Sequence, residues 1–237
     1  QWETSFNISF PKNKLIDFPG LEGSTYANSY VIGEPISIVK LYHLEGINPQ
    51  TGQYQFTDYN KDGKITSPDD RQVIKNIGIE FFGGLSNNFT YKNWNLSFLI
   101  QFVKQQNRNY NYIMPSPGIM SNLPVEALNV WSPQNPDGYY MPYHANATAS
   151  HTLFQGSDAT VSDASFIRLK NIQVSYRIPV SNMQSKNSKR IIKEAKIYFQ
   201  GQNLYTWTKY FGIDPEFSSI GFLPPLRTYS LGMQINF

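Results

Sequence analysis

The residues best placed to do chemistry in this sequence lie in one short loop that has the spacing of a calcium-binding turn. Asp58, Asn60 and Asp62 occupy ligand positions one, three and five, and Gly63 provides the sharp turn that follows. A hard cation needs several oxygen ligands, and alternating Asp and Asn side chains converge on one point in such a loop. The predicted set is completed by the carbonyl of position seven and the side chains of positions nine and twelve, which are Lys64, Thr66 and Asp69.

Two features of this loop depart from the usual calcium-binding pattern. Position twelve is an Asp, which is shorter than the usual bidentate Glu, and Pro68 precedes it, so Asp70 is an alternative ligand. No amphipathic helices flank the loop, and a bound ion would therefore stiffen it rather than switch it. An Asx-rich turn that bonds its own backbone without any ion is the alternative. The sequence predicts a structural Ca²⁺ site and leaves the ion-free turn open.

Other kinds of chemistry find little support in the sequence. The chain has no Cys, and its three His residues show no paired spacing for a metal. It has no nucleophile elbow and no Gly-rich phosphate loop. Asp214 and Glu216 flank Pro215 and are interpreted as a rigid loop corner rather than an acid–base pair. A net charge of +3 is too small to indicate nucleic acid. We therefore predict no catalytic residue and no nucleic-acid partner.

The segments that connect and position these candidate residues are predicted to be β-strands. The last segment of the chain shows the pattern on which this prediction depends. Residues 226–237 alternate between apolar side chains and polar, uncharged ones. This is the pattern of a transmembrane β-strand, whose lipid face and lumen face alternate, although a half-buried strand of a soluble protein looks similar. The apolar set ends on a terminal aromatic residue, which resembles the assembly signal of outer-membrane barrels: Tyr229, Leu231, Met233, Ile235 and Phe237.

The same alternation recurs along the chain in six segments. Each is long enough for the roughly 9–11 residues that a tilted strand needs to cross a membrane. In one of them the phase changes at Phe166–Lys170, a part that we expect to extend beyond the membrane. The six segments are about 2–10, 79–91, 94–102, 166–178, 196–207 and 226–237.

Composition agrees with a barrel and excludes a helical membrane protein. The mean hydropathy is -0.42, and no stretch approaches the roughly 18 consecutive apolar residues of a membrane helix. Aromatic residues make up 15% of the chain, with 16 Tyr and 16 Phe, which suits aromatic girdles at two membrane interfaces. A soluble, Tyr-rich β-sandwich remains an alternative on composition alone.

The connections between the predicted strands alternate in length as they do in outer-membrane barrels, which have short periplasmic turns and long extracellular loops. A tight turn at Lys92–Asn93 and the link 180–194 fall inside. The predicted extracellular loops are about 12–78, 107–162 and 208–226. Six strands cannot close a membrane barrel, for which about eight is the minimum. An open edge in lipid would leave unpaired backbone groups. We therefore expect either that the chain is the C-terminal piece of a larger barrel or that its edges pair with other chains.

The longest predicted loops contain groups with more than one interpretation. Ser121–Val130 is expected to form a short helix capped by Ser121 or Asn122. The basic run Lys186, Lys189, Arg190 and Lys193 is interpreted as a solvated turn. Aromatic residues of the loop 107–162 either stack on sugar rings or pack the loop and contact a partner. They are Tyr110, Tyr112, Trp131, Tyr139, Tyr140 and Tyr143, with His144 beside them.

Several motifs, in this order, resemble the C-terminal part of SusC/RagA-like TonB-dependent transporters of Bacteroidetes outer membranes. The resemblance extends from about residue 29 to the end of the chain. The motifs are DYNKDGKIT at 58–66, Ile77-Gly78, ASFIRLKNI at 164–172, QNLYTWTKYFGIDPE at 202–216 and the terminal Phe237.

This resemblance implies an all-β fold in which residues 1–237 form the C-terminal part, six or so antiparallel strands, of a large plugged barrel of roughly 22 strands. It implies active import of an oligosaccharide or a peptide across the bacterial outer membrane. The implied partners are a SusD-like lipoprotein, TonB through the missing N-terminal part, the remaining barrel and plug segments, and outer-membrane lipid. Two alternatives stay open: a soluble, calcium-stabilised, carbohydrate-binding β-sandwich, and a purely structural barrel or adhesin without cargo.

Overall fold

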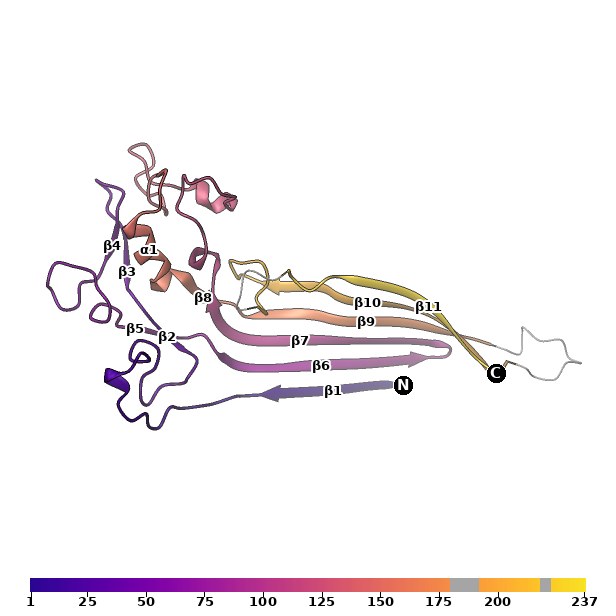
Figure 1. Ribbon diagram of the computed structural model, residues 1–237. Helices are drawn as coiled ribbons and strands as arrows, with labels where there is room; N and C mark the ends of the chain where they lie inside the picture. The colour runs from indigo at the N-terminus through magenta and orange to yellow at the C-terminus, as the bar shows by residue number, and fades with distance from the viewer. Residues whose placement is uncertain (180–191, 218–222) are drawn as a thin grey trace, which may run out of the picture.

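The main feature of the computed structural model, which describes residues 1–179, 192–217 and 223–237, is one sheet of long antiparallel strands (Figure 1). The order across the sheet is β1-β6-β7-β9-β10-β11, and β8 pairs with the end of β7. This confirms the predicted fold class, and we call the sheet the wall. Its strands are β1 (Trp2–Ser9), β6 (Ile79–Tyr91), β7 (Trp94–Arg108), β8 (Val161–Asp163), β9 (Phe166–Ile178), β10 (Glu194–Thr208) and β11 (Thr228–Asn236).

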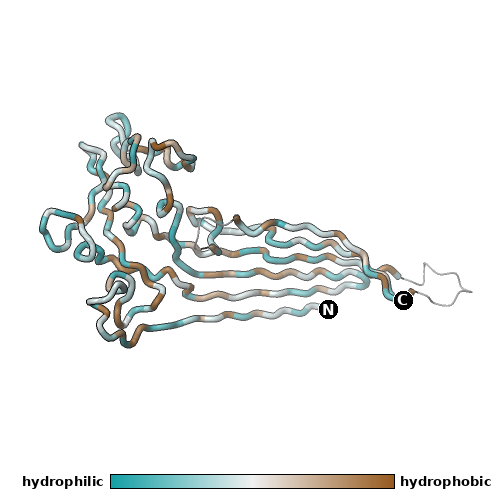
Figure 2. The backbone as a smooth tube through the Cα atoms, viewed as in Figure 1, coloured by the Kyte–Doolittle hydropathy of each residue, from teal (hydrophilic) through white to brown (hydrophobic). Residues whose placement is uncertain are grey.

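The register of the wall aligns apolar side chains into continuous rows on one face. Leu96 lies opposite Phe89 on β6 and opposite Val174 on β9. One such row crosses all six long strands: Trp2, Phe89, Leu96, Val174, Phe199 and Leu231. The adjacent row, on the other face, is polar: Glu3, Asn88, Ser97, Gln173, Gln200 and Ser230. Figure 2 shows hydropathy changing from residue to residue along the strands. The register turns this alternation into two faces of opposite character.

The change of phase in the fourth predicted strand is a β-bulge. On β9 the register against β7 shifts between Leu99 and Ile100, which leaves Lys170 without a Cα partner there. Beyond the bulge the strand continues in the same sheet, and Ile167 lies opposite Phe102. The extra residue restores the apolar side chains to the apolar face.

A glycine on β6 makes room for aromatic rings from the two neighbouring strands, β1 and β7, on the apolar face. Gly83 pairs with Phe102, and a Cβ at Gly83 would lie 2.5 Å from an atom of that ring. The ring of Phe102 in turn stacks on Phe6 of β1, with 5.8 Å between the centroids. The absent side chain is thus replaced by an aromatic ring from the neighbouring strand, an arrangement known to rescue glycine in sheets.

The described parts of the three long connections gather at one end of the wall, and the tight turn at Lys92–Asn93 lies at the other (Figure 1). The link between β9 and β10 starts at the end that carries the tight turn, because Tyr176 near the end of β9 pairs with Trp94 beside that turn. Most of that link lies outside the described residues, and the predicted basic run at Lys186, Lys189 and Arg190 lies there too.

The first connection contains two small hairpin-like sheets, β2 with β5 and β3 with β4. The second contains the α-helix α1 and several 3₁₀ turns. The bounds are η1 (Leu21–Gly23), β2 (Ile38–Leu41), β3 (Leu44–Ile47), β4 (Tyr54–Phe56), β5 (Val73–Asn76), η2 (Tyr110–Tyr112), η3 (Val125–Leu128), α1 (Ala149–Gln155) and η4 (Asp158–Thr160). No helix in the described part of the chain is long and apolar enough to cross a membrane.

The expected helix at Ser121–Val130 is wrong in length and in its cap. The structure has only the 3₁₀ turn η3 there, preceded by Pro124 and without a side-chain cap. The α-helix forms later, where the hydroxyl of Thr148 accepts a hydrogen bond from the backbone N–H of His151. Proline and the short apolar run limit the earlier segment to a single tight turn.

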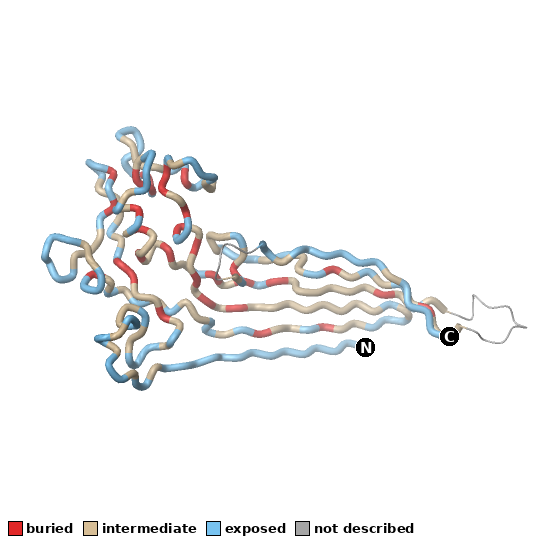
Figure 3. Tube along the Cα trace, in the orientation of Figure 1, coloured by how far each residue is buried: buried red, intermediate tan, exposed pale blue. Residues whose placement is uncertain are grey.

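The hydrophobic core lies in the loop assembly rather than behind the wall (Figure 3). Tyr54 stacks on Phe154 with 4.5 Å between the ring centroids. The buried cluster is Tyr54, Met114, Ala127, Tyr140, Met141 and Phe154.

The alternative of a β-sandwich is wrong, because the long strands form a single sheet. Both small sheets belong to the loops, and nothing in the described ranges forms a second layer across the wall. The strands β1 and β11 each pair on one side only in the described part of the chain.

Candidate transport surface

The polar face of the wall carries the side chains that were predicted to line a lumen. Asn95 donates from Nδ2 to Oδ1 of Asn88 at 2.7 Å and to the hydroxyl of Thr90 at 3.1 Å. The register places all of the predicted lumen residues on this one face: Asn95, Ser97, Gln101, Gln173, Gln200 and Gln202. The face is therefore hydrogen-bonding and mostly uncharged.

One charged side chain interrupts this face near the loops. Arg168 on β9 pairs with Gln101 of β7 and is only 1% exposed. Its Nη2 donates to both oxygens of Asp214 at 2.8 and 2.7 Å, and its Nη1 donates to Glu216 at 2.5 Å. Its Nε donates to the hydroxyl of Thr206 at 2.9 Å. We call this group the arginine clamp.

The arginine clamp occupies both carboxylates that flank Pro215. A bidentate guanidinium–carboxylate pair fixes geometry as well as charge, so the loop after β10 is held rigidly against the inner face. This fits a rigid corner rather than an acid–base pair. Sequence reasoning missed Arg168 as a functional residue, although a charged side chain between the apolar Ile167 and Leu169 was a usable signal.

The same loop is also tied to the end of β7. Gln105 donates from Nε2 to the carbonyl of Pro215 at 2.5 Å, and Asn107 donates from Nδ2 to the carbonyl of Phe217 at 3.3 Å. The backbone N–H of Tyr110 bonds the carbonyl of Phe211 at 2.8 Å. The connection after β10 and the connection after β7 are therefore joined at several points.

The aromatic residues of the second connection divide into packed and exposed groups. Tyr140 is buried, and its hydroxyl donates to Oδ1 of Asn111 at 2.8 Å. Burial raises the pKa of Tyr140 well above its ordinary value, so it stays a donor. Tyr139 and Tyr143 are 44% and 55% exposed.

Tyr139 borders a hollow of about 530 Å³ where the loops meet the ends of the wall strands. Glu126, Asn129 and Lys209 also line it, so the hollow combines an aromatic ring with carboxylate, amide and ammonium groups. Such a mixture suits a hydrated, hydrogen-bonding ligand better than an apolar one.

In the acidic loop at 58–70, the predicted ligands accept hydrogen bonds from the backbone. Asp58 accepts from the N–H groups of Lys61 at 2.7 Å and Gly63 at 2.8 Å. Asn60 and Asp62 each accept from the residue two places further on, at 3.1 and 2.8 Å. This is the pattern of successive Asx turns.

The end of this loop is held by Asp70 instead of Asp69. Asp70 is fully buried and accepts from the N–H groups of Tyr59 at 2.7 Å and Thr66 at 2.8 Å. Asp69 is exposed. Among the described residues, no three carboxylate or imidazole side chains form a cluster that could hold a metal ion. The side chains of Asp58, Asn60 and Asp62 fit a calcium site only in part.

The faces of the wall and the comparisons with known proteins agree. TonB-dependent receptor P3 of Formosa agariphila is 26% identical over the whole chain, and TonB-dependent receptor SusC of Bacteroides thetaiotaomicron is 24% identical over the whole chain. The chain is SusC/RagA-like. No family model matches it.

Solved structures show the same fold. The RagAB peptide importer in its open-open state superposes with a TM-score of 0.75 at 21% identity, and the RagAB peptide transporter with 0.73 at 23% identity. Each match covers all of this SusC/RagA-like chain. It belongs to the bacterial outer membrane as part of a β-barrel.

The SusC/RagA-like chain spans about a quarter of the proteins that it matches: 27% of receptor P3, 24% of SusC and 27% of the RagAB chain. The edges of β1 and β11, which lack a second neighbour in the described ranges, fit a segment of a larger barrel. These relatives are named as receptors and importers rather than enzymes, which agrees with the predicted lack of a catalytic site.

Proposed function

We propose that this chain forms wall and outer loops of a transporter that imports a nutrient, an oligosaccharide or a peptide, across the outer membrane with energy from TonB. The observation that carries the proposal is the two-faced wall: one continuous apolar row and one continuous polar row cross every long strand. The similarity to TonB-dependent receptors, which extends along the whole of this chain, supports the proposal.

The polar face is the side that meets the plug and the hydrated cargo. Its Gln and Asn side chains offer both donors and acceptors without a fixed charge. A sugar hydroxyl or a peptide amide can exchange its water for such groups at small net cost. Gln173 and Gln200, which are direct neighbours across β9 and β10, are the clearest pair.

The hollow beside Tyr139 is a second surface that can meet cargo, at the base of the loops. An aromatic ring with an amide and a carboxylate nearby can stack on a sugar ring or pair with a peptide backbone. We propose that a SusD-like lipoprotein binds over these loops as a lid. The RagAB structures and SusC, as relatives, support that partner.

The proposal is tested by uptake in cells that carry the complete transporter. Uptake of labelled oligosaccharides and peptides should be saturable and should stop when TonB is deleted. Tyr139→Ala should lower uptake, whereas Val125→Ala, a 79% exposed residue of the neighbouring turn, should not. Uptake that continues undiminished without TonB would contradict active import. A tagged transporter should also co-purify a lipoprotein.

We propose further that the acidic loop binds Ca²⁺ through Asp58, Asn60 and Asp62, with the carbonyl of Lys64, the side chain of Thr66 and Asp69 or Asp70 completing the set. Each carboxylate oxygen that accepts one backbone N–H keeps a second lone pair for a cation. Calcium should protect residues 58–70 of the complete transporter from proteolysis, and Asp58→Ala with Asp62→Ala should remove that protection. Protection that is the same with calcium and with a chelator would mean that the Asx turns hold the loop without an ion.

A further inference from the structure

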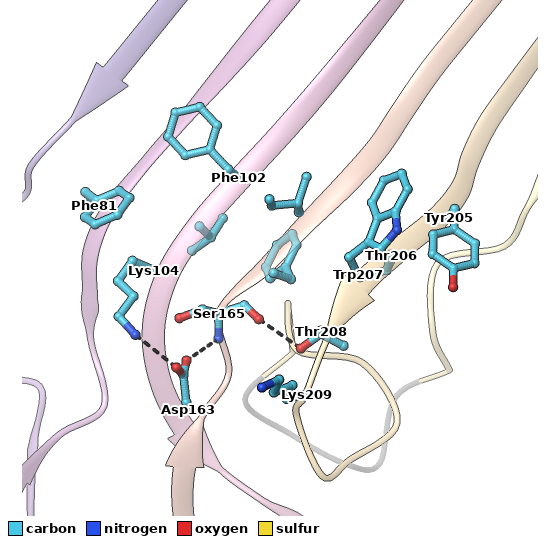
Figure 4. A pocket seen from close by; sticks show the side chains of 13 residues that line it. Phe81, Phe102, Lys104, Asp163, Ser165, Tyr205, Thr206, Trp207, Thr208 and Lys209 are labelled. Atoms are coloured by element: carbon cyan, nitrogen blue, oxygen red, sulfur yellow. Dashed lines mark hydrogen bonds and ion pairs between the residues drawn. The ribbon is translucent and has the colours of Figure 1, made fainter.

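A groove of about 840 Å³ lies where the strands β7, β9 and β10 reach the loops (Figure 4). Its floor is apolar: Phe102, Ile167 and Trp207 are direct neighbours across the three strands. Phe102 is six positions from Leu96 along β7, so the two side chains lie on the same, apolar face. Ile167 and Trp207 lie on that face too, because they pair in register with Phe102. The groove therefore opens toward the lipid.

The loop side of the groove is polar. Lys104 donates from Nζ to Asp163 at 2.9 Å, and the other oxygen of Asp163 accepts from the backbone N–H of Ser165 at 2.8 Å. Thr208 donates to the carbonyl of Ser165 at 2.9 Å. These bonds form a chain across the rim, which Figure 4 shows below the aromatic rings.

Lys209 adds an ammonium group to this rim. Its side chain is exposed, and the described residues supply it with no ion pair. Lys104 uses one of its three donors on Asp163, which leaves two for another acceptor. Among the residues that line the groove, two ammonium groups stand against the carboxylate of Asp163. The carboxylate of Glu80 also lies near Lys104, so Lys209, which has no ion pair within the described residues, is the group most complementary to an anion.

The order of these layers matches the order of groups in a lipid, with an apolar part followed by a charged one. Trp207 and Lys209 are two positions apart, so the charged rim stands roughly 7 Å beyond the aromatic floor along the strand. Lipid headgroups meet a membrane protein just outside its belt of aromatic residues, and basic pockets at that level bind phosphate groups.

We propose that this groove binds one phosphate-bearing lipid of the leaflet on the loop side, which is the outer leaflet when the loops are extracellular. An acyl chain lies along Phe102, Ile167 and Trp207, and the phosphate meets Lys209 and the free donors of Lys104. The groove is not a passage for cargo, because on the opposite face the arginine clamp fills the position next to Ile167.

The test uses the complete transporter, purified in detergent and titrated with phosphatidylglycerol or diacylglycerol while bound lipid is counted by native mass spectrometry. One phosphatidylglycerol should be retained per transporter, and diacylglycerol should be retained much less. Lys209→Gln should weaken phosphatidylglycerol binding about fivefold, as expected for one lysine near a lipid phosphate. Trp207→Ala should weaken binding of both lipids.

Lys12→Gln is the matched control, because Lys12 is an exposed lysine that lines a different hollow. It should leave binding unchanged, and an equal loss in this variant would overturn the proposal in favour of general charge attraction. Competition by inorganic phosphate at equal concentration would show a site for free oxyanions instead. Since Lys209 is exposed, its variant keeps the test valid even if Trp207→Ala assembles poorly.

Discussion

The wall and the loop assembly treat apolar side chains in opposite ways. Most fully buried apolar residues lie in the loops, including Leu41, Met114 and Phe154, whereas the strands expose large ones such as Leu231 at 79% (Figure 3). The loops bury apolar surface against one another, as a protein in water does. The wall has hydrocarbon for a solvent on one face and leaves its apolar rows uncovered.

The difference shows how one chain can be stable against both lipid and water. The strands that face lipid alternate apolar and polar residues, whereas the loops in water do not. Along the strands, every second residue is apolar, and pairing between strands satisfies the backbone. In the loops, apolar residues come together from distant positions, as Tyr54 and Phe154 do. Mutations should therefore have effects that depend on the region as well as on the residue type.

The largest expected effect is in the loop core. Phe154→Ala removes a fully buried ring that stacks on Tyr54 and should destabilise the loop assembly by about 3–5 kcal/mol. Hydrogen exchange should accelerate in the loops while the wall keeps its protection. Val125→Ala in the same connection should change little, because Val125 is exposed. Equal acceleration in both variants would mean that the loops have no core of their own.

The next effect concerns the arginine clamp. Arg168→Met leaves Asp214 and Glu216 without their buried partner, and the loop should lose about 3 kcal/mol of stability toward local opening. Exchange of the amides at 209–217 measures this. Arg177→Met is the control, since that arginine is largely exposed and its pair with Glu194 should contribute less than about 1 kcal/mol. Similar effects would show that the clamp is not desolvated.

A charge on the wall should matter on one face only. Leu231→Arg puts a cation into hydrocarbon and should reduce stability by roughly 2–4 kcal/mol. Ser230→Arg, one residue away on the opposite face, should be tolerated. The folded fraction of the complete transporter, read from its heat-dependent migration in gels, separates the two. If both variants assemble equally well, the assignment of the faces is wrong.

The smallest expected effect is a pH dependence of the loop core. Burial lowers the pKa of His151, whose Nε2 lies 2.8 Å from the carbonyl of Met114. The unfolded loop then binds a proton more readily than the folded one, so stability should fall as pH drops below about 6.5, the ordinary value, and level off below the lowered pKa. Exchange rates at pH 7.5 and 5 test this. His151→Gln should abolish the change, and a pH effect that persists in this variant must come from other groups.

The wall could be predicted well from the sequence, because a period of two that continues for a whole segment fits a β-strand and hardly any other structure. The predicted strand at 79–91 has the bounds of β6. The bulge on β9 was visible only as a change of phase, since a sequence cannot distinguish an inserted residue from the end of a strand.

The candidate site was harder to predict for two physical reasons. Arg168 meets Asp214 and Glu216 across 46 and 48 residues, and no local pattern reports a contact at such a distance. In the acidic loop, Asp70, one position beyond the usual spacing, takes the buried position and accepts from the N–H groups of Tyr59 and Thr66. Spacing alone could nominate both aspartates but could not choose between them.

The hydrogen bonds at the tip of β7 have a mechanical consequence. Because Gln105, Asn107 and Tyr110 bond to the segment 211–217, the connection after β7 and this described part of the connection after β10 are joined to the same strand. A partner that pulls on either loop must displace both, and the force passes into β7 as tension along its length. The opening of a lid at this rim would then be felt in the barrel itself.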